Sequence, residues 1–250
     1  MKLRSETIDP ARLTPSQRAE LCRNIADITA MIFDGVTYER IQSHVVEAPA
    51  EQTHIRLYYG PNDALMGYFI FHRYDREYGG KRVIILRVEA GLVPEARGHR
   101  MIRQVLSAAL WLKLKHPFRR MFYLDTLVHA SSYHLFHRYT PFMYPAPNRN
   151  IPPALMPLIN SVLATFPDPM AHQSDPLVRK VGWITREADK KNAPRDDSSG
   201  ARFFKSRNPG YVSGEGLVVV IPVTLTNIRG GAFRVAQARI ISLFRSSPDP

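Results

Sequence analysis

The feature that most constrains the fold is a strand, a long helix and a second strand in direct succession. Residues 83–88 are β-branched or apolar, apart from one arginine, as in a buried strand. A stretch with apolar residues at helical spacing follows Gly98 and ends at His116-Pro117, and residues 121–124 form the next apolar strand. Two strands joined through one helix cross over in the right-handed sense and lie parallel. The sequence therefore predicts an α/β fold in which at least part of the sheet is parallel.

The hydrophobic pattern also predicts the elements before and after this unit. Thr14 is expected to cap a helix, with Pro15 in its first position and Gln17 completing a capping box. A turn over residues 60–63 joins two strands rich in aromatic and β-branched residues into a hairpin. The predicted order is helix 14–35, helix 37–49, strands 54–59, 65–74 and 83–88, the helix after Gly98, strand 121–124 and helix 131–139.

The chain changes character after Pro145. A helix is predicted over 151–166, a buried strand over 217–221 and a last helix that includes 233–244. The segment 167–214 is rich in Pro, Asp, Ser and Lys and is expected to be irregular. Because this tail holds too little apolar material for its own core, we divide the chain into a domain over 1–147 and an extension over 148–250. The extension is expected to pack on that domain, or on a second subunit in a homodimer.

Residues 92–102 lie between the third strand and the long helix. A strand that ends in a loop and runs into a helix places unpaired N–H groups and the positive end of the helix dipole around one point. Such a point binds an anion. Arg97, His99 and Arg100 add positive charge, so a pyrophosphate is the expected ligand.

This segment resembles the acyl-CoA-binding motif of the GNAT superfamily of acyltransferases, in which an apolar strand end is followed by Pro-Glu-x-Arg-Gly-x-Gly-x-Gly and a helix. The matching residues are Pro94, Glu95, Arg97 and Gly98. Leu92 stands where the family's strand-end residue offers its backbone N–H to the donor. Arg100 and Ile102 replace residues that are usually glycine or small. The resemblance implies a donor-binding set of Leu92, Arg97, Gly98, His99, Arg100, Met101 and Ile102.

Residues 129–139 are similar to the family's fourth helix, where Asn-x-x-Ala-x-x-Leu-Tyr is common. His129 replaces the Asn, and Phe136 replaces the Tyr that often protonates the departing thiolate. A Phe cannot donate a proton. The resemblance implies a GNAT-like mixed central sheet flanked by helices. It also implies that strands 83–92 and 121–128 diverge at the end where Leu92 and His129 lie, because the family's donor inserts there like an extra strand.

The function implied by the resemblance is that of an N-acyltransferase, which moves an acyl group from acyl-CoA, or from an acyl carrier protein, to an amine. The donor is then an acyl-phosphopantetheine thioester used as a substrate. The lost glycines and the apolar hairpin favour a longer acyl group on a carrier protein. The alternative is a non-catalytic module of the same fold that binds an acyl ligand or nucleic acid, since the usual acid is missing.

Two residues are candidates for accepting the proton of the amine. Glu89 is the carboxylate nearest the loop and can act as a base directly or through a water, although Arg87 on the same strand face makes an ion pair the simpler interpretation. His129 follows a buried strand and either accepts a proton or caps the next helix. His134 and His137 lack a third ligand in the sequence nearby, so no metal is predicted.

The composition of the chain bears on its partners and on its location in the cell. Lys and Arg total 34 against 22 Asp and Glu, which gives a net charge of +12 and a pI of about 10.0. Phosphates, anionic lipid, nucleic acid and an acidic carrier protein all fit this charge. The single cysteine, Cys22, excludes an intrachain disulfide and a cysteine-based zinc site. No window approaches the roughly 18 apolar residues of a membrane span, and the N-terminus lacks a signal-like core, so a cytoplasmic protein is expected.

Overall fold

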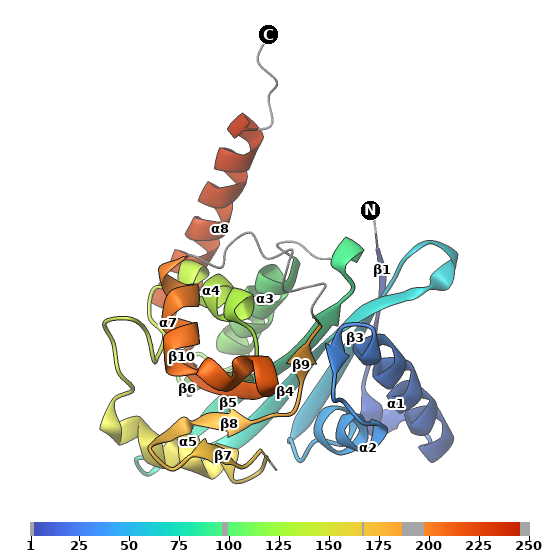
Figure 1. Ribbon diagram of the computed structural model, residues 1–250, viewed down its shortest axis with the longest axis horizontal. Coiled ribbons are helices and arrows are strands. Elements are labelled where there is room, and N and C mark those ends of the chain that lie inside the picture. The colour runs from blue at the N-terminus through green and yellow to red at the C-terminus, as the bar shows by residue number, and fades with distance from the viewer. Residues whose placement is uncertain (1–2, 97–99, 167, 187–197, 246–250) are drawn as a thin grey trace.

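The computed structural model describes residues 3–96, 100–166, 168–186 and 198–245 of the chain. Within these residues, one mixed sheet of eight strands runs in the order β1, β3, β4, β5, β6, β10, β8, β7 (Figure 1). Its strands are β1 Arg4–Ile8, β3 Gln52–Tyr59, β4 Leu65–Tyr78, β5 Lys81–Leu92, β6 Arg120–Leu127, β7 Met170–His172, β8 Asp175–Lys180 and β10 Glu215–Pro222. Two short strands outside this sheet, β2 Phe33–Asp34 and β9 Ile184–Thr185, pair antiparallel with each other.

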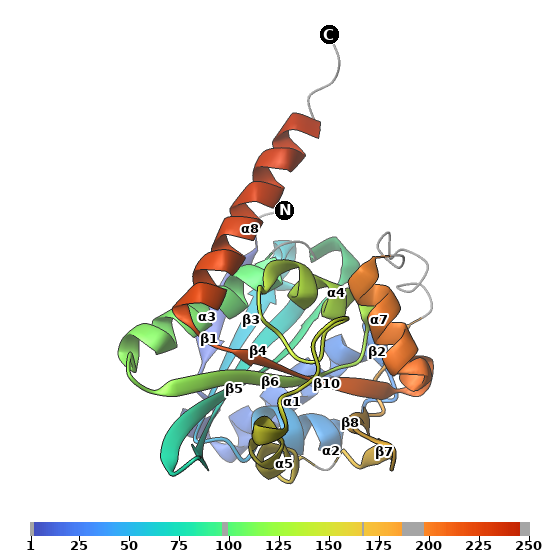
Figure 2. The same ribbon diagram turned by 90° about the vertical axis from the view of Figure 1, so that its left-hand side faces the viewer.

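Helices cover both faces of the sheet, as the edge view in Figure 2 shows. They are α1 Pro15–Ala30, α2 Tyr38–Ile41 with a π-helical turn over Gln42–Val46, α3 Arg100–Lys115, α4 Ala130–Tyr139, α5 Met156–Leu163, α7 Ser199–Arg207 and α8 Leu225–Arg245. α1, α2 and α5 lie against one face, and α3, α4, α7 and the start of α8 against the other. Among the described helices, none combines the length and apolarity that a membrane crossing requires.

The predicted local signals and the fold class are confirmed. The Thr14 hydroxyl accepts the backbone N–H of Gln17, and the Gln17 side chain accepts that of Thr14, so the capping box begins α1. Strands β3 and β4 form the predicted antiparallel hairpin around residues 61–63. Strand β5 runs antiparallel to β4 and parallel to β6, with α3 as the crossover. This is the GNAT-like mixed sheet that the resemblance implies.

The parallel strands β5 and β6 are joined along only part of their length. Backbone pairing links residues 83–86 to residues 120–123 and stops there, although β5 continues to Leu92 and β6 to Leu127. On their outer sides, β4 follows β5 as far as Leu92 and β10 follows β6 as far as Leu127. The outer edges therefore stay in the sheet while the inner edges diverge. The predicted divergence near Leu92 and His129 is confirmed.

The structure corrects the expectation that residues 167–214 are irregular. The described residues of this segment form β7, β8, β9 and α7. Strand β8 buries Leu177 and Val178 and pairs with β10, which in turn pairs with β6. The extension thus completes one edge of the central sheet. Strands of two to six residues carry too few apolar positions to show a period, and pairing with distant partners defines them instead.

Candidate functional site

A cleft of about 110 Å³ opens where β5 and β6 diverge. Its lining comes from β5 and β6, from β2 and the α2 region, from α3 and α4, and from the extension. The residues are Phe33, Arg40, His44, Arg87, Val88, Glu89, Ala90, Val105, Tyr123, Asp125, Thr126, Leu127, Val128, Ser132, Phe136, Val181 and Trp183. Side chains that lie far apart in the sequence therefore meet at the gap in the sheet.

A buried charged cluster lies at the base of this cleft. The Arg87 Nη2 atom is 3.0 Å from Glu89 Oε1, and its Nε atom is 3.8 Å from Asp125 Oδ1. The Tyr123 hydroxyl donates a hydrogen bond of 2.7 Å to Asp125 Oδ2. The Arg87 guanidinium also lies over the ring of Phe166, 3.9 Å from the ring centre. One arginine thus serves two carboxylates that are both nearly excluded from water.

Glu89 differs from the other carboxylates of the cluster in its hydrogen bonding. Among the described residues, no donor forms a hydrogen bond to either of its carboxylate oxygens, whereas Asp125 accepts bonds from Tyr123 and from the backbone N–H of Thr126. Burial raises the pKa of Glu89 to about 7 even though Arg87 acts to lower it. A carboxyl group with this pKa exchanges a proton near neutral pH, as a catalytic acid or base must.

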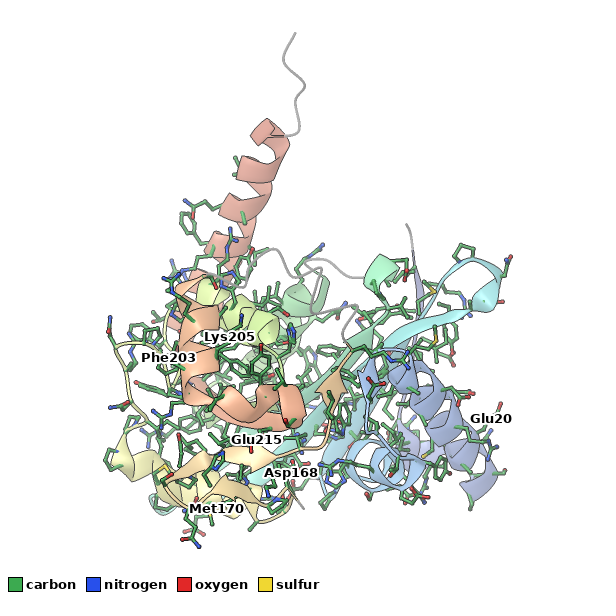
Figure 3. All side chains as sticks on the ribbon, in the orientation of Figure 1. Glu20, Asp168, Met170, Phe203, Lys205 and Glu215 are labelled. Atoms are coloured by element: carbon green, nitrogen blue, oxygen red, sulfur yellow. The ribbon has the colours of Figure 1, made fainter. Side chains whose placement is uncertain are left out.

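A second ion pair involves Arg40, which lines the cleft. Arg40, on α2, contacts Asp168, which is 2% exposed and lies next to the short strands of the extension (Figure 3). With Arg87, Glu89 and Asp125, the cluster holds two positive and three negative side chains when all are ionised. Arg179, whose Nε donates a hydrogen bond of 2.8 Å to the backbone carbonyl of Asp168, brings a further positive charge beside that carboxylate. Burial is the main cause of the raised pKa of Glu89, and the charges of Asp125 and Asp168 act in the same direction.

His44 is a neutral member of the cleft. Burial lowers its pKa to about 4, and the charge of Arg40 acts in the same direction. Its Nδ1 lies 3.0 Å from the Ser43 hydroxyl. Since its imidazole is uncharged at neutral pH, His44 leaves the charge balance of the cluster unchanged.

The two candidate bases, Glu89 and His129, differ in their contacts. The predicted ion pair between Glu89 and Arg87 is present, and Glu89 also lines the cleft. His129 caps α4, because its Nδ1 accepts the backbone N–H of Ser131 at 3.1 Å and lies 2.6 Å from the Ser131 hydroxyl. The capping interpretation of His129 is confirmed. With Nδ1 engaged in this way, Glu89 is the stronger candidate for proton transfer.

Part of the predicted donor loop lies outside the described residues, namely Arg97, Gly98 and His99. Leu92 is buried at the end of β5, and Ile102 is buried in the first turn of α3. The backbone of α3 begins at Arg100 and continues through Met101. The side chains of these two residues lie outside the described part of the structure. The helix start is therefore where the sequence predicts it, and anion binding there stays a prediction.

Sequence reasoning missed Arg40, His44, Tyr123, Asp125 and Asp168. Only Asp125 had a local signal, since it is the one carboxylate inside the apolar strand β6. The others come together through tertiary folding. Among the described residues, no group of three or more His, Cys, Asp or Glu side chains is arranged to hold a metal ion.

The chain has low similarity to several solved structures. No family model matches the chain, and no curated protein matches it. A probable N-acyltransferase from Enterococcus faecalis is 12% identical at a TM-score of 0.39, and the match covers 58% of this chain and 33% of that one. An acyl-CoA N-acyltransferase from Pseudomonas aeruginosa is 18% identical at a TM-score of 0.36, with 55% and 87% covered. At these values the likeness carries no argument about function, which rests on the cleft itself.

Proposed function

We propose that the protein is an acyltransferase that moves an acyl group from acyl-CoA to a small amine in the cleft between β5 and β6. The observation that carries this proposal is Glu89. It is a buried carboxyl group that is ion-paired with Arg87 but accepts no hydrogen bond from the described residues, its pKa is about 7, and it lines the gap between two diverging parallel strands. A site of this kind suits a reaction in which an amine must lose a proton.

The diverging strands support a thioester with a pantetheine arm as the donor. Beyond Leu86 and Tyr123 no backbone pairing joins β5 to β6. The amide groups of a pantetheine arm can form hydrogen bonds with strand edges, as an additional strand does. An arm in this position brings its thioester to the level of Glu89. Acyl-CoA and a carrier protein present the same arm, and we take acyl-CoA as the donor.

The charge of the cluster supports an amine as the acceptor. An amine arrives as an ammonium ion at neutral pH, and its positive charge is attracted to the ionised form of Glu89, whose carboxylate oxygens accept no hydrogen bond from the described residues. The rings of Phe33 and Trp183, whose centres are 5.4 Å apart, line the same cleft. Aromatic faces attract cations. We therefore place the amine between this ring pair and Glu89.

In the transfer step, Glu89 takes one proton from the ammonium group, and the neutral nitrogen attacks the thioester carbonyl carbon. The new C–N bond forms, the C–S bond breaks, and the thiolate leaves. The thiolate takes up the second proton that the nitrogen releases, directly or through water, and Glu89 returns its proton to solvent. The products are an amide and a free thiol.

A thiol-release assay tests this proposal. Acetyl-CoA is incubated with the protein and a panel of small amines at pH 8, and the free thiol is measured over time. We expect at least one amine to accelerate thiol release above the rates with protein alone and with amine alone. Acyl-CoA binding without amine-dependent release points to the non-catalytic alternative. Phe136, which lines the cleft where the family has a proton-donating Tyr, is the observation that favours that alternative.

The remaining predicted partners stay proposals. The net charge of +12 supports an acidic carrier protein as a second source of the pantetheine arm. Repeating the assay with an acyl carrier protein as donor distinguishes the two sources. Nucleic-acid binding and a homodimer through the extension rest on charge and on the sequence pattern of the tail alone.

The start of α3 provides a separate prediction about the donor. If the Arg100 guanidinium contacts a CoA phosphate, Arg100→Ala removes a charged hydrogen bond and raises the dissociation constant of acetyl-CoA about ten-fold, as measured by calorimetry. Arg103→Ala, at an exposed position of the same helix, is the control and leaves the constant unchanged. If Arg100→Gly strengthens binding instead, the side chain obstructs the phosphates. An unchanged affinity in both Arg100 variants contradicts phosphate binding here.

A further inference from the structure

A second cavity of about 40 Å³ adjoins the cleft on the side of the sheet that α3, α4 and α8 cover. Its lining residues are Phe71, Leu86, Val88, Ile102, Val105, Leu106, Ala109, Tyr123, Phe136, Thr140, Ile221, Pro222, Val223, Asn227 and Ile228. Four of these also line the cleft, namely Val88, Val105, Tyr123 and Phe136. The two spaces therefore meet at one shared boundary. We call the second cavity the apolar chamber.

The walls of the apolar chamber select an apolar ligand. Most of the lining side chains are aliphatic or aromatic. The Asn227 side chain is already engaged, because its Nδ2 donates to the carbonyls of Phe142 and Pro222 and its Oδ1 accepts the backbone N–H of Phe142. The Tyr123 hydroxyl is directed to Asp125. A polar ligand would lose its hydration here with little compensation, whereas a hydrocarbon loses nothing.

We propose that the apolar chamber receives the acyl chain of the donor and sets its length. This inference rests on the proposed function, because it assumes that the thioester carbonyl lies in the cleft. Val88 and Phe136 line both spaces, so a chain that continues from that carbonyl between these two side chains reaches the chamber. The volume of about 40 Å³ holds about three water-sized groups, at roughly 10–15 Å³ each. The preferred acyl group therefore has about four to six carbons and not two.

The competing explanation is a packing void without a ligand. Protein interiors are close-packed, and an empty apolar void lowers stability. Filling such a void raises the thermal stability and changes no ligand preference. Filling a chain-binding chamber instead changes which acyl group the protein accepts. The two explanations therefore differ in chain-length selectivity, which can be measured independently of stability.

The experiment titrates the full chain with acetyl-, butyryl-, hexanoyl- and palmitoyl-CoA by calorimetry. Each buried methylene group strengthens binding roughly four-fold, so butyryl- and hexanoyl-CoA should bind at least about ten-fold more tightly than acetyl-CoA. Palmitoyl-CoA should gain nothing further. Ala109→Leu places a branched side chain in the chamber and should weaken hexanoyl-CoA about ten-fold while leaving acetyl-CoA unchanged. Ala108→Leu makes the same substitution at the next position, which lines neither cavity, and should change neither affinity.

A second variant guards against a folding failure of the first. Ile228→Ala enlarges the chamber from the α8 side and should shift the preference towards a longer chain such as octanoyl-CoA. Equal affinities for acetyl- and hexanoyl-CoA in the wild type overturn the inference and leave the proposed function intact. The same holds if Ala109→Leu raises the melting temperature without changing selectivity. If no acyl-CoA binds at all, both the inference and the proposed function fail.

Discussion

Replacing Glu89 with glutamine is expected to lower kcat/KM for amine acylation by about 100- to 10,000-fold, the range that a positioned general base contributes. Glutamine keeps the size of the side chain but cannot accept the proton of the ammonium group. The affinity for acetyl-CoA should change little, because the proposed pantetheine contacts are made by strand backbone. The loss should therefore appear in kcat and in the acceptor's kcat/KM and not in donor binding.

Steady-state thiol release and donor titration on the same protein samples check this prediction. Glu77→Gln is the matched control, since Glu77 is exposed near the far end of β4. It should leave all rates unchanged. If Glu89→Gln transfers acyl groups at the wild-type rate, Glu89 serves only as the ion-pair partner of Arg87, and the proposed chemistry loses its base.

Replacing Arg87 with methionine is expected to lower the free energy of unfolding by about 3–5 kcal/mol. The change leaves Glu89 and Asp125 buried without their shared cation, and each ionised form then lacks compensation. The variant also loses the contact between the guanidinium and the Phe166 ring. Without the positive charge, the pKa of Glu89 should rise further, because Arg87 is the neighbour that lowers it most, ahead of Arg40.

Denaturant unfolding at pH 7 measures this effect. The double variant Arg87→Met with Glu89→Gln should recover part of the loss, because one of the two buried carboxylates is removed with the arginine. Arg4→Met breaks an ion pair whose two side chains are 56% and 79% exposed, and it should cost no more than about 1 kcal/mol. If Arg87→Met also lowered the free energy of unfolding by only about 1 kcal/mol, the buried cluster would contribute little to the stability of the fold.

The sequence predicts the parts of this protein that local pattern controls. The capping residues of α1, the crossover through α3 and the divergence of β5 from β6 all follow from short-range signals or from the family resemblance. Strand β1 escaped prediction because it is a mostly exposed, polar edge strand without an apolar period. The short strands of the extension could not be predicted either, because they are defined only by their pairing with strands that are distant in the sequence.

Only the part of the site that is formed by residues close together in the sequence could be predicted. Arg87 and Glu89 are two positions apart on one strand, so their ion pair follows from strand geometry. Arg40 and Asp168 are 128 positions apart, and no local pattern indicates that they meet. The burial of Glu89, which is the main cause of its raised pKa, and the nearby charges of Asp125 and Asp168 all depend on tertiary packing. The raised pKa of Glu89 was therefore beyond sequence reasoning.

The pH dependence of kcat/KM for amine acylation tests whether Glu89 is the base. Glu89 accepts a proton only when it is ionised, and burial raises its pKa to about 7. We expect kcat/KM to fall about ten-fold for each pH unit below that value, with an inflection near pH 7 that disappears in Glu89→Gln. A separate inflection at the pKa of the amine itself should remain in both proteins. An inflection near pH 7 that persists in Glu89→Gln, or a wild-type profile without one, would contradict the assignment of Glu89 as the base.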